Sequence, residues 1–234
     1  MNDRLFELSA DRFVYYYAVY SPLTRQLPVH AQGSGIYDQN FEHLPALNVT
    51  INSVFASYKY FEHVEQELRV DLTFKANILE TARRWLEQQI PDRWKDKEFA
   101  RVVIHVRRTD YLKRAYERDG WPRPTDDYLL RAMSYFADCL ERVQFVVLSD
   151  DPRWCSKHIN ATDIVYSSGH SPIEDMAIAS LCDHAIMTIG TYGWWAAWFA
   201  NGVTITQRNL PRNSSRLAKR LYRADHYKPH WIGL

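Results

Sequence analysis

Apolar and polar residues alternate with helical spacing in the stretch that follows residue 72. Between residues 73 and 90, apolar side chains recur every four residues, which places them on one face of an α-helix. Pro91 comes next and ends this helix, because proline has no backbone N–H to donate. The pattern predicts an amphipathic helix that packs one side against a core.

From residue 100 onward, short apolar runs alternate with segments of helical spacing. The runs that predict buried strands are 101–106, 144–148, 163–166, 184–188 and 203–206. The segments between them predict helices at 129–140, 153–158, 172–181 and 194–200. Strands that alternate with helices predict an α/β fold built on a parallel sheet.

Two of these helices carry explicit start signals. Asp151 followed by Pro152 is typical of an N-cap with proline at the first helical position. Ser171, Pro172 and Glu174 form the sequence of a capping box. Both signals support the predicted helix positions.

One segment, residues 185–207, has no charged side chain and is long enough to cross a bilayer. Gly190, Gly193 and Gly202 interrupt it, so we predict a strand, a loop, a helix, a turn and a strand rather than a membrane span. A membrane-embedded interaction protein is the alternative that this segment leaves open. Residues 1–7 are rich in charge, so no signal peptide is expected there.

The first 60 residues are rich in aromatic side chains and give the least regular pattern. Residues 13–20 fit a strand, and residues 53–61 have a similar aromatic character.

Composition narrows the class of protein. The chain has 234 residues, 46% of them hydrophobic and 24% charged, which suits a globular protein and excludes a disordered or collagen-like chain. Its net charge is only +1, so no nucleic-acid partner is expected and any anion site must be local. Three cysteines (Cys139, Cys155 and Cys182) without a Cys-x-x-Cys pair argue against a zinc site, and their odd number leaves at least one thiol free.

The sharpest candidate chemistry lies where the predicted strands end. In parallel sheets, ligands bind outside the carboxyl ends of the strands. This edge collects Arg107, Arg108 and Asp110 after one strand, Ser149, Asp150 and Asp151 after the next, and residues 189–193 after a later one. Arginine forks match phosphate oxygens, so the pair predicts an anion site. A structural Arg–Asp pair at a strand end is the equal alternative.

Several other residues near this edge can be interpreted in more than one way. Gly190, Thr191 and Tyr192 form a turn before a helix that suits a phosphate or ribose. His105 is either a core histidine or an orienting group at the floor of the crevice. Ser149-Asp150-Asp151 is either a metal motif or, as Pro152 favours, a helix cap. Asp175 suits ribose binding or a base better than Glu174, which the capping box already uses.

Several familiar signatures are missing from the sequence. The sequence has no Gly-x-Gly-x-x-Gly, P-loop or Gly-x-Ser-x-Gly motif. This argues against an NAD-binding protein, a P-loop NTPase and a serine hydrolase. Glycosylation sequons begin at Asn48, Asn160 and Asn213, and they mildly favour a secretory-pathway protein.

Four blocks, in order, resemble the galactoside α-1,2-fucosyltransferase family over about residues 55–234. They are His105-Val-Arg-Arg-Thr-Asp-Tyr111; Phe145-Val-Val-Leu-Ser-Asp-Asp151 with Trp154-Cys155; the stretch from Asp175 to Trp198; and Tyr227-Lys-Pro-His-Trp-Ile-Gly233. The resemblance implies a GT-B-like fold, with a Rossmann-like GDP-fucose domain at 101–234 and an incomplete, acceptor-side N-terminal domain at 1–100. It also implies an inverting, metal-independent enzyme without a cofactor, which moves L-fucose from GDP-fucose to the 2-hydroxyl of a terminal β-galactoside on a glycan.

The resemblance assigns roles to residues and a place in the cell. Arg107 and Arg108 would hold the diphosphate, with Arg108 slightly preferred, and His105 and Asp110 would shape the donor site. The remaining donor-site residues it implies are Ser149, Asp150, Asp175, Gly190, Thr191 and Tyr192. Members of the family act in the Golgi lumen, and animal members carry a membrane anchor. The general base is not assigned.

This sequence departs from the family in two places. Thr109 stands where the family has glycine. The family's opening strand, turn and helix, and the anchor, are not recognised here, so we expect the chain to begin inside the first domain. Two alternatives stay open: a truncated or non-catalytic relative that binds GDP-sugar or glycan without turnover, and a fucosyltransferase that forms another linkage or acts on a protein hydroxyl.

Overall fold

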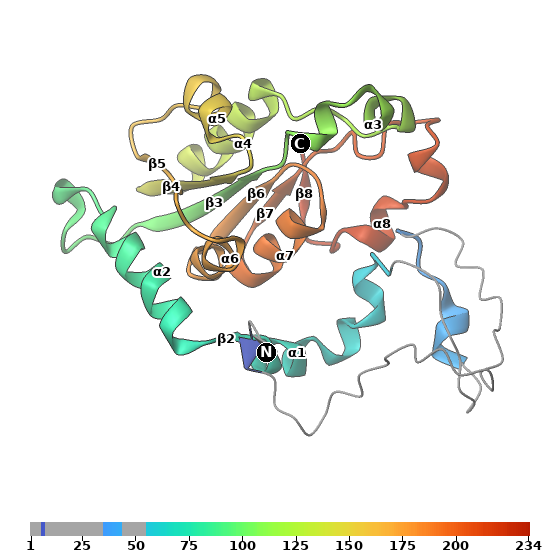
Figure 1. Cartoon of the computed structure of the whole chain (residues 1–234), viewed down its shortest axis with the longest axis horizontal. Helices are drawn as coiled ribbons and strands as arrows, with labels where there is room; N and C mark the ends of the chain where they lie inside the picture. The colour runs from blue at the N-terminus through green and yellow to red at the C-terminus, as the bar shows by residue number, and fades with distance from the viewer. Residues whose placement is uncertain (1–5, 8–34, 44–54) are drawn as a thin grey trace.

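The computed structural model describes residues 6–7, 35–43 and 55–234. A six-stranded sheet forms its centre (Figure 1). The strands are β3 (Ala100–Val106), β4 (Val143–Ser149), β5 (Ile164–Tyr166), β6 (His184–Met187), β7 (Thr204–Thr206) and β8 (Ile232–Gly233). All five pairings between neighbours are parallel, which confirms the predicted α/β class with a parallel sheet.

The order of the strands fixes where a ligand can bind. The spatial order is β5-β4-β3-β6-β7-β8. The chain therefore runs outward from β3 to β5, returns to the other side of β3 as β6, and runs outward again. A crevice opens at the carboxyl ends of the two strands where the direction reverses, and in this sheet those strands are β3 and β6.

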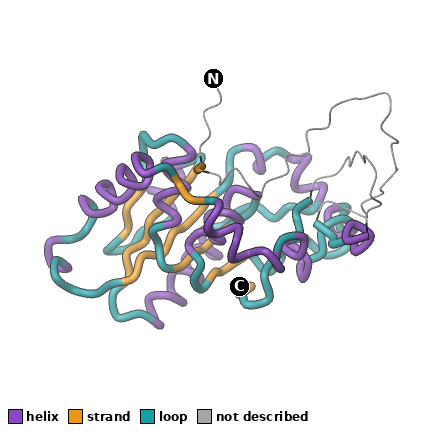
Figure 2. The backbone as a smooth tube through the Cα atoms, turned by 90° about the horizontal axis from the view of Figure 1, so that it is seen from below, coloured by secondary structure: helices purple, strands orange, loops and turns teal. Residues whose placement is uncertain are grey.

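Helices cover both faces of the sheet (Figure 2): α4 (Asp126–Cys139) and α5 (Pro152–His158) lie on one face, and α2 (Ala76–Gln88), α6 (Pro172–Ser180) and α7 (Thr191–Ala200) on the other. The shorter helices α1 (Glu65–Asp71), α3 (Arg114–Asp119) and α8 (Arg223–His226) lie beyond the edges of these two layers. A short antiparallel pair, β1 (Phe6–Glu7) with β2 (Thr73–Phe74), lies beside α1.

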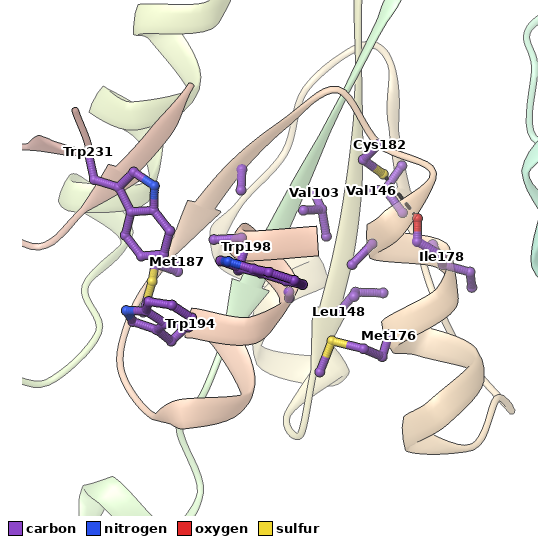
Figure 3. Close-up of a cluster of buried hydrophobic side chains, with 14 of the residues drawn as sticks. Val103, Val146, Leu148, Met176, Ile178, Cys182, Met187, Trp194, Trp198 and Trp231 are labelled. Atoms are coloured by element: carbon purple, nitrogen blue, oxygen red, sulfur yellow. Dashed lines mark hydrogen bonds between the residues drawn. The ribbon is translucent and has the colours of Figure 1, made fainter. Parts of the chain in front are cut away.

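Two hydrophobic cores lie on opposite faces of the sheet, because successive strand residues point in opposite directions. Val102 and Ile104 of β3 face the core that α4 and α5 cover. Val103 faces the other core, which α2, α6 and α7 cover and which includes Trp194 and Trp198 (Figure 3). Burial on both faces explains why the strands read as unbroken apolar runs.

The predicted helix starts are confirmed. Asp151 accepts a hydrogen bond from the backbone N–H of Trp154, and Ser171 and Glu174 complete the capping box. The segment 185–207 is strand, loop, helix, turn and strand, as predicted. No helix in the described part of the chain is both long and apolar enough to cross a membrane.

Two features differ from the sequence-based expectations. Within residues 53–61, the described part is no strand: it contains the 3-10 turn η2 (Tyr58–Tyr60), whose start Ser57 caps. The same Ser57 hydroxyl donates to the Asp225 carbonyl at 2.6 Å, so contacts with α8, not strand pairing, set this conformation. Strand β8 was not expected at all. The predicted strand at 13–20 lies outside the described residues.

Candidate functional site

Hydrogen bonds between side chain and backbone tie together the carboxyl ends of three strands. The backbone N–H of Arg107, which follows β3, donates to Thr188 Oγ1 at 3.0 Å, just beyond β6. The Ser149 hydroxyl, at the end of β4, donates to the Val106 carbonyl at 2.9 Å. The loops after β3, β4 and β6 therefore start from one fixed platform at the switch point.

Arg107 lies on this platform between two carboxylates. Its Nε and Nη2 donate to the two Asp110 oxygens at 2.9 and 3.1 Å, and its Nη1 lies 3.3 Å from Asp150 Oδ2. The hydrogen bond to Asp110 raises the pKa of Arg107, and burial opposes this only in part. Its side chain is 40% exposed, so the guanidinium is held in place yet accessible.

Arg107 also lies next to the turn that opens α7. A Cβ atom placed on Gly190 would lie 3.9 Å from Arg107 Cγ. Gly190 has φ of 91°, a conformation that glycine adopts without strain. Within residues 6–7, 35–43 and 55–234, no side chain caps the first turn of α7, so the backbone N–H groups of Thr191 and Tyr192 can bind an anion.

Arg108 points the other way. Its guanidinium carbon lies 4.1 Å from the centre of the Trp154 ring, and its Nε donates to Asp151 Oδ2 at 3.1 Å. Its side chain is only 17% exposed, less than half the exposure of Arg107. Adjacent in sequence, the two arginines thus serve different neighbours, Arg108 beside α5 and Arg107 beside α7.

Asp150 fixes the turn that carries both arginines. Its Oδ1 accepts the Arg108 backbone N–H at 2.8 Å, and its Oδ2 accepts the Thr109 N–H at 3.2 Å and the Thr109 hydroxyl at 2.5 Å. Thr109 has φ of −52° and ψ of −54°, which any residue adopts. Threonine therefore fits where the resembled family has glycine, and its hydroxyl adds a hydrogen bond.

His105 is buried beneath α7, on the face of β3 opposite Ile104. Its Nδ1 has no hydrogen-bond partner in the described part of the protein, and its ring lies 5.1 Å from that of Tyr192. Burial lowers the pKa of His105 to about 4, so the imidazole is neutral at physiological pH. Gly193 packs against the ring, which leaves no room for a side chain there.

A second polar group lies at the start of α6. The Ser167 hydroxyl donates to Asp175 Oδ1 at 2.5 Å, and His170 Nδ1 lies 2.8 Å from the same hydroxyl. Burial raises the pKa of Asp175, although the Ser167 hydrogen bond opposes the rise. The Tyr192 hydroxyl donates to the Pro172 carbonyl, which joins the starts of α6 and α7.

The remaining candidates lie apart from this edge. Asn160 and Asn213 are exposed, and Asn48 lies outside the described residues. Cys139, Cys155 and Cys182 are free thiols. Residues 6–7, 35–43 and 55–234 contain no group of three or more His, Cys, Asp or Glu side chains arranged to hold a metal.

The sequence placed residues 189–193, Gly193 included, at this edge, but it predicted neither the Thr188 hydroxyl as an acceptor nor the close contact of Gly193 with His105. Thr188 ends an apolar run, so nothing marks its hydroxyl as the acceptor for Arg107. Gly193 was noted only as the close of a turn, although a second glycine at helical spacing is a signal of close packing.

The strand order and the polar carboxyl edge define a doubly wound sheet of the nucleotide-binding type. The model of glycosyl transferase family 11 matches residues 25–234, and the chain belongs to this family.

Curated relatives agree with this assignment. The galactoside alpha-(1,2)-fucosyltransferase 1 of Sus scrofa is 31% identical over 217 residues, which are 90% of this chain and 58% of that protein. The protein of the same name from Oryctolagus cuniculus is 34% identical over 185 residues, 76% of this chain and 49% of that protein. The chain thus spans about half the length of the curated relatives it matches. The solved structure of POFUT1 in its apo-form aligns at 12% identity and a TM-score of 0.48, over 72% of this chain and 57% of that one.

Proposed function

We propose that the chain transfers L-fucose from GDP-fucose to the 2-hydroxyl of a terminal β-galactoside on a glycan. Membership of family 11 and the names of the relatives support this reaction. The observation that carries the proposal is the position of Arg107: a charged, half-exposed side chain at the switch point, whose Cγ borders the start of α7 at Gly190.

Arg107 and the first turn of α7 would hold the diphosphate of the donor. When the 2-hydroxyl oxygen of the acceptor bonds to the anomeric carbon of fucose, the bond from that carbon to the phosphate oxygen breaks, GDP leaves with the electron pair, and the hydroxyl proton passes to solvent. The guanidinium and the helix N–H groups stabilise the charge that develops on GDP. Attack from the face opposite GDP inverts the anomeric centre.

The reaction needs no metal in this proposal, because Arg107 supplies positive charge where the leaving group forms. The arrangement of the acidic side chains supports this. Asp110 and Asp150 accept hydrogen bonds or ion pairs from Arg107 and from the backbone of residues 108 and 109. Asp151 pairs with Arg108 and caps α5.

The guanosine would lie on the side of Arg107 where His105, Tyr192 and Asp175 meet. A carboxylate matches the adjacent N–H donors of guanine, and Asp175 is held by Ser167 at this side of the α7 start. The Tyr192 ring supplies an apolar face for the nucleoside, and the buried His105 ring packs 5.1 Å from it and supports its position. Ser149 and Asp150 position the platform rather than contact the base.

Arg108 acts as a positioning residue in this account, although the family resemblance favoured it as the main phosphate ligand. Its stacking on Trp154 and its pairing with Asp151 hold the loop that presents Arg107. The exposed sequons at Asn160 and Asn213 fit the Golgi lumen as the place of action.

Transfer of labelled fucose from GDP-fucose to a panel of β-galactosides tests the reaction, with linkage analysis of the product. A 2-linked fucose on galactose supports the proposal. Binding of GDP without any transfer would identify a non-catalytic relative, and a product of another linkage would overturn the acceptor position.

A further inference from the structure

A pocket with aromatic walls lies between the segment that begins at residue 55 and the start of α7. It is shallow and open to solvent on one side, so its walls would cover one face of a sugar ring rather than enclose the ring. Its lining residues are Phe55, Ala56, Ser57, Tyr58, Phe61, Thr191, Trp194, Trp195 and His226.

The aromatic walls are packed into a fixed geometry. Phe61 stacks on Trp195 with ring centres 5.6 Å apart and planes 19° apart, and it meets Trp194 edge-on at 5.8 Å. Phe55, at 42% exposure, lies at the solvent side. Such rigid faces suit the C–H groups of a pyranose, which are grouped on one face of galactose because its 4-hydroxyl is axial.

His226 brings the polar function that a sugar hydroxyl needs. Its Nδ1 lies 2.7 Å from the Ala56 carbonyl, which requires the proton on Nδ1 and leaves the lone pair on Nε2. Burial lowers the pKa of His226, so Nε2 stays unprotonated at neutral pH. Nε2 has no hydrogen-bond partner elsewhere in the described residues.

The backbone of His226 is held as firmly as its ring. Its carbonyl accepts the Trp194 indole N–H at 2.8 Å, and the preceding carbonyl of Asp225 accepts the Ser57 hydroxyl. Lys59 pairs with the Asp225 carboxylate at 2.7 Å. These bonds fix both sides of the pocket to each other before any ligand arrives, which lowers the cost of binding.

The pocket adjoins the diphosphate site through one residue. Thr191 lines the pocket, and the next residue back, Gly190, borders Arg107. Tyr192 points to the opposite side, toward α6 and Asp175. A nucleotide sugar bound along this line would place its nucleoside beside Tyr192 and its sugar end beside Thr191.

We infer that this pocket binds the acceptor galactosyl ring, stacked on the Trp195–Phe61–Phe55 wall, with a ring hydroxyl donating to His226 Nε2. The inference rests on the proposed function for its choice of sugar. It adds the place where the acceptor binds, which lies between residues 55–61 and the α7 start.

The test is a saturation-transfer NMR titration of methyl β-galactoside into the full chain, with and without GDP. The wild-type chain is expected to bind the galactoside and to discriminate against methyl β-glucoside. His226→Asn keeps a donor for the Ala56 carbonyl but removes the Nε2 lone pair, so galactoside affinity should fall about tenfold while GDP affinity is unchanged.

Phe55→Ala supplies a second variant that leaves the histidine intact, and it should weaken galactoside binding about threefold to tenfold. Leu130→Ala is its matched control, because Leu130 is also 42% exposed but lies on α4, outside the pocket. The assignment is overturned if the wild type does not bind the galactoside, or if both pocket variants bind it as the wild type does. A chain that binds galactoside but not GDP would instead overturn the proposed function.

Discussion

Gly193 packs directly against the imidazole of His105: a Cβ atom at residue 193 would overlap Nδ1 and lie 3.2 Å from both Cγ and Cε1. The two residues come from α7 and β3, so this contact sets how closely the start of α7 approaches the switch point. That approach also places Gly190 beside Arg107. The glycine is therefore needed for the geometry of the proposed diphosphate site, not only for the turn.

Gly193→Ala should destabilise the protein although alanine favours helices. The helix gains about 1 kcal/mol from alanine, but overpacking against a buried ring costs about 1–3 kcal/mol. We expect a net loss of about 1 kcal/mol in urea unfolding, and a loss of GDP affinity, because α7 must move away from Arg107. In a His105→Ala background the same substitution should cost less. An equal cost in both backgrounds would contradict the contact.

Asp175→Asn should make the protein more stable at neutral pH and weaken GDP binding. The folded state raises the pKa of Asp175, so it binds more protons than the unfolded state just above the ordinary aspartate pKa. Stability is therefore lost as pH rises through that window. Asparagine can still accept the Ser167 hydrogen bond but carries no charge.

Denaturant midpoints of the wild type and Asp175→Asn, measured from pH 4 to pH 8, check this. The difference in stability should grow with pH and then level off. A variant that is less stable at every pH, or that binds GDP as the wild type does, would remove Asp175 from the proposed guanosine side.

Burial of His105 should make the free energy of unfolding change with pH in the opposite direction at acid pH. Burial lowers its pKa from 6.5 to about 4, so the unfolded state binds more protons between these values and stability falls as pH drops through this range. The loss reaches about 3 kcal/mol at full protonation. His226 contributes with the same sign. His105→Gln should flatten the stability curve between pH 6.5 and 4, and an unchanged slope would mean that His105 is solvated in solution.

The strands could be predicted from sequence because both of their faces are buried. Val102, Val103 and Ile104 are at most 1% exposed, so their segment is continuously apolar and its end is easy to locate. Once the strand ends were located, the arginines and carboxylates that follow them could be placed at the carboxyl edge of the sheet. Strand β8 was missed because two residues carry no periodic signal.

The separate orientations of Arg107 and Arg108 could not be predicted from sequence. Strand alternation stops at Val106, and the turn beyond it is set by Asp150, which lies more than 40 residues downstream. The aromatic pocket was missed for the same reason. It forms only when residues 55–61 meet α7 and His226, and each of these reads locally as ordinary core or loop.

Chelation should leave fucose transfer unchanged. Asp110, Asp150 and Asp151 are occupied by arginine or backbone donors, and Arg107 provides the charge that a metal would otherwise provide. The rate of transfer with excess EDTA should equal the rate without it. Activity that EDTA removes and Mn²⁺ or Mg²⁺ restores would contradict the metal-independent reaction.

Replacing each of the two arginines in turn gives a matched test of the proposed diphosphate site. Replacing either arginine by alanine removes one positive charge, and the two positions are adjacent in the sequence. The Arg107 side chain borders the α7 turn at Gly190, whereas Arg108 is stacked on Trp154 and paired with Asp151. A charge-assisted hydrogen bond contributes about 1.5–3 kcal/mol, which corresponds to a change of about tenfold to a hundredfold in affinity.

The most direct measurement is the affinity for GDP, by calorimetry, of the wild type, Arg107→Ala and Arg108→Ala. The wild type should bind GDP. Arg107→Ala should bind GDP about tenfold to a hundredfold or more weakly, and Arg108→Ala should lose less affinity. A chain that does not bind GDP, or a larger loss in Arg108→Ala than in Arg107→Ala, would contradict the site described above.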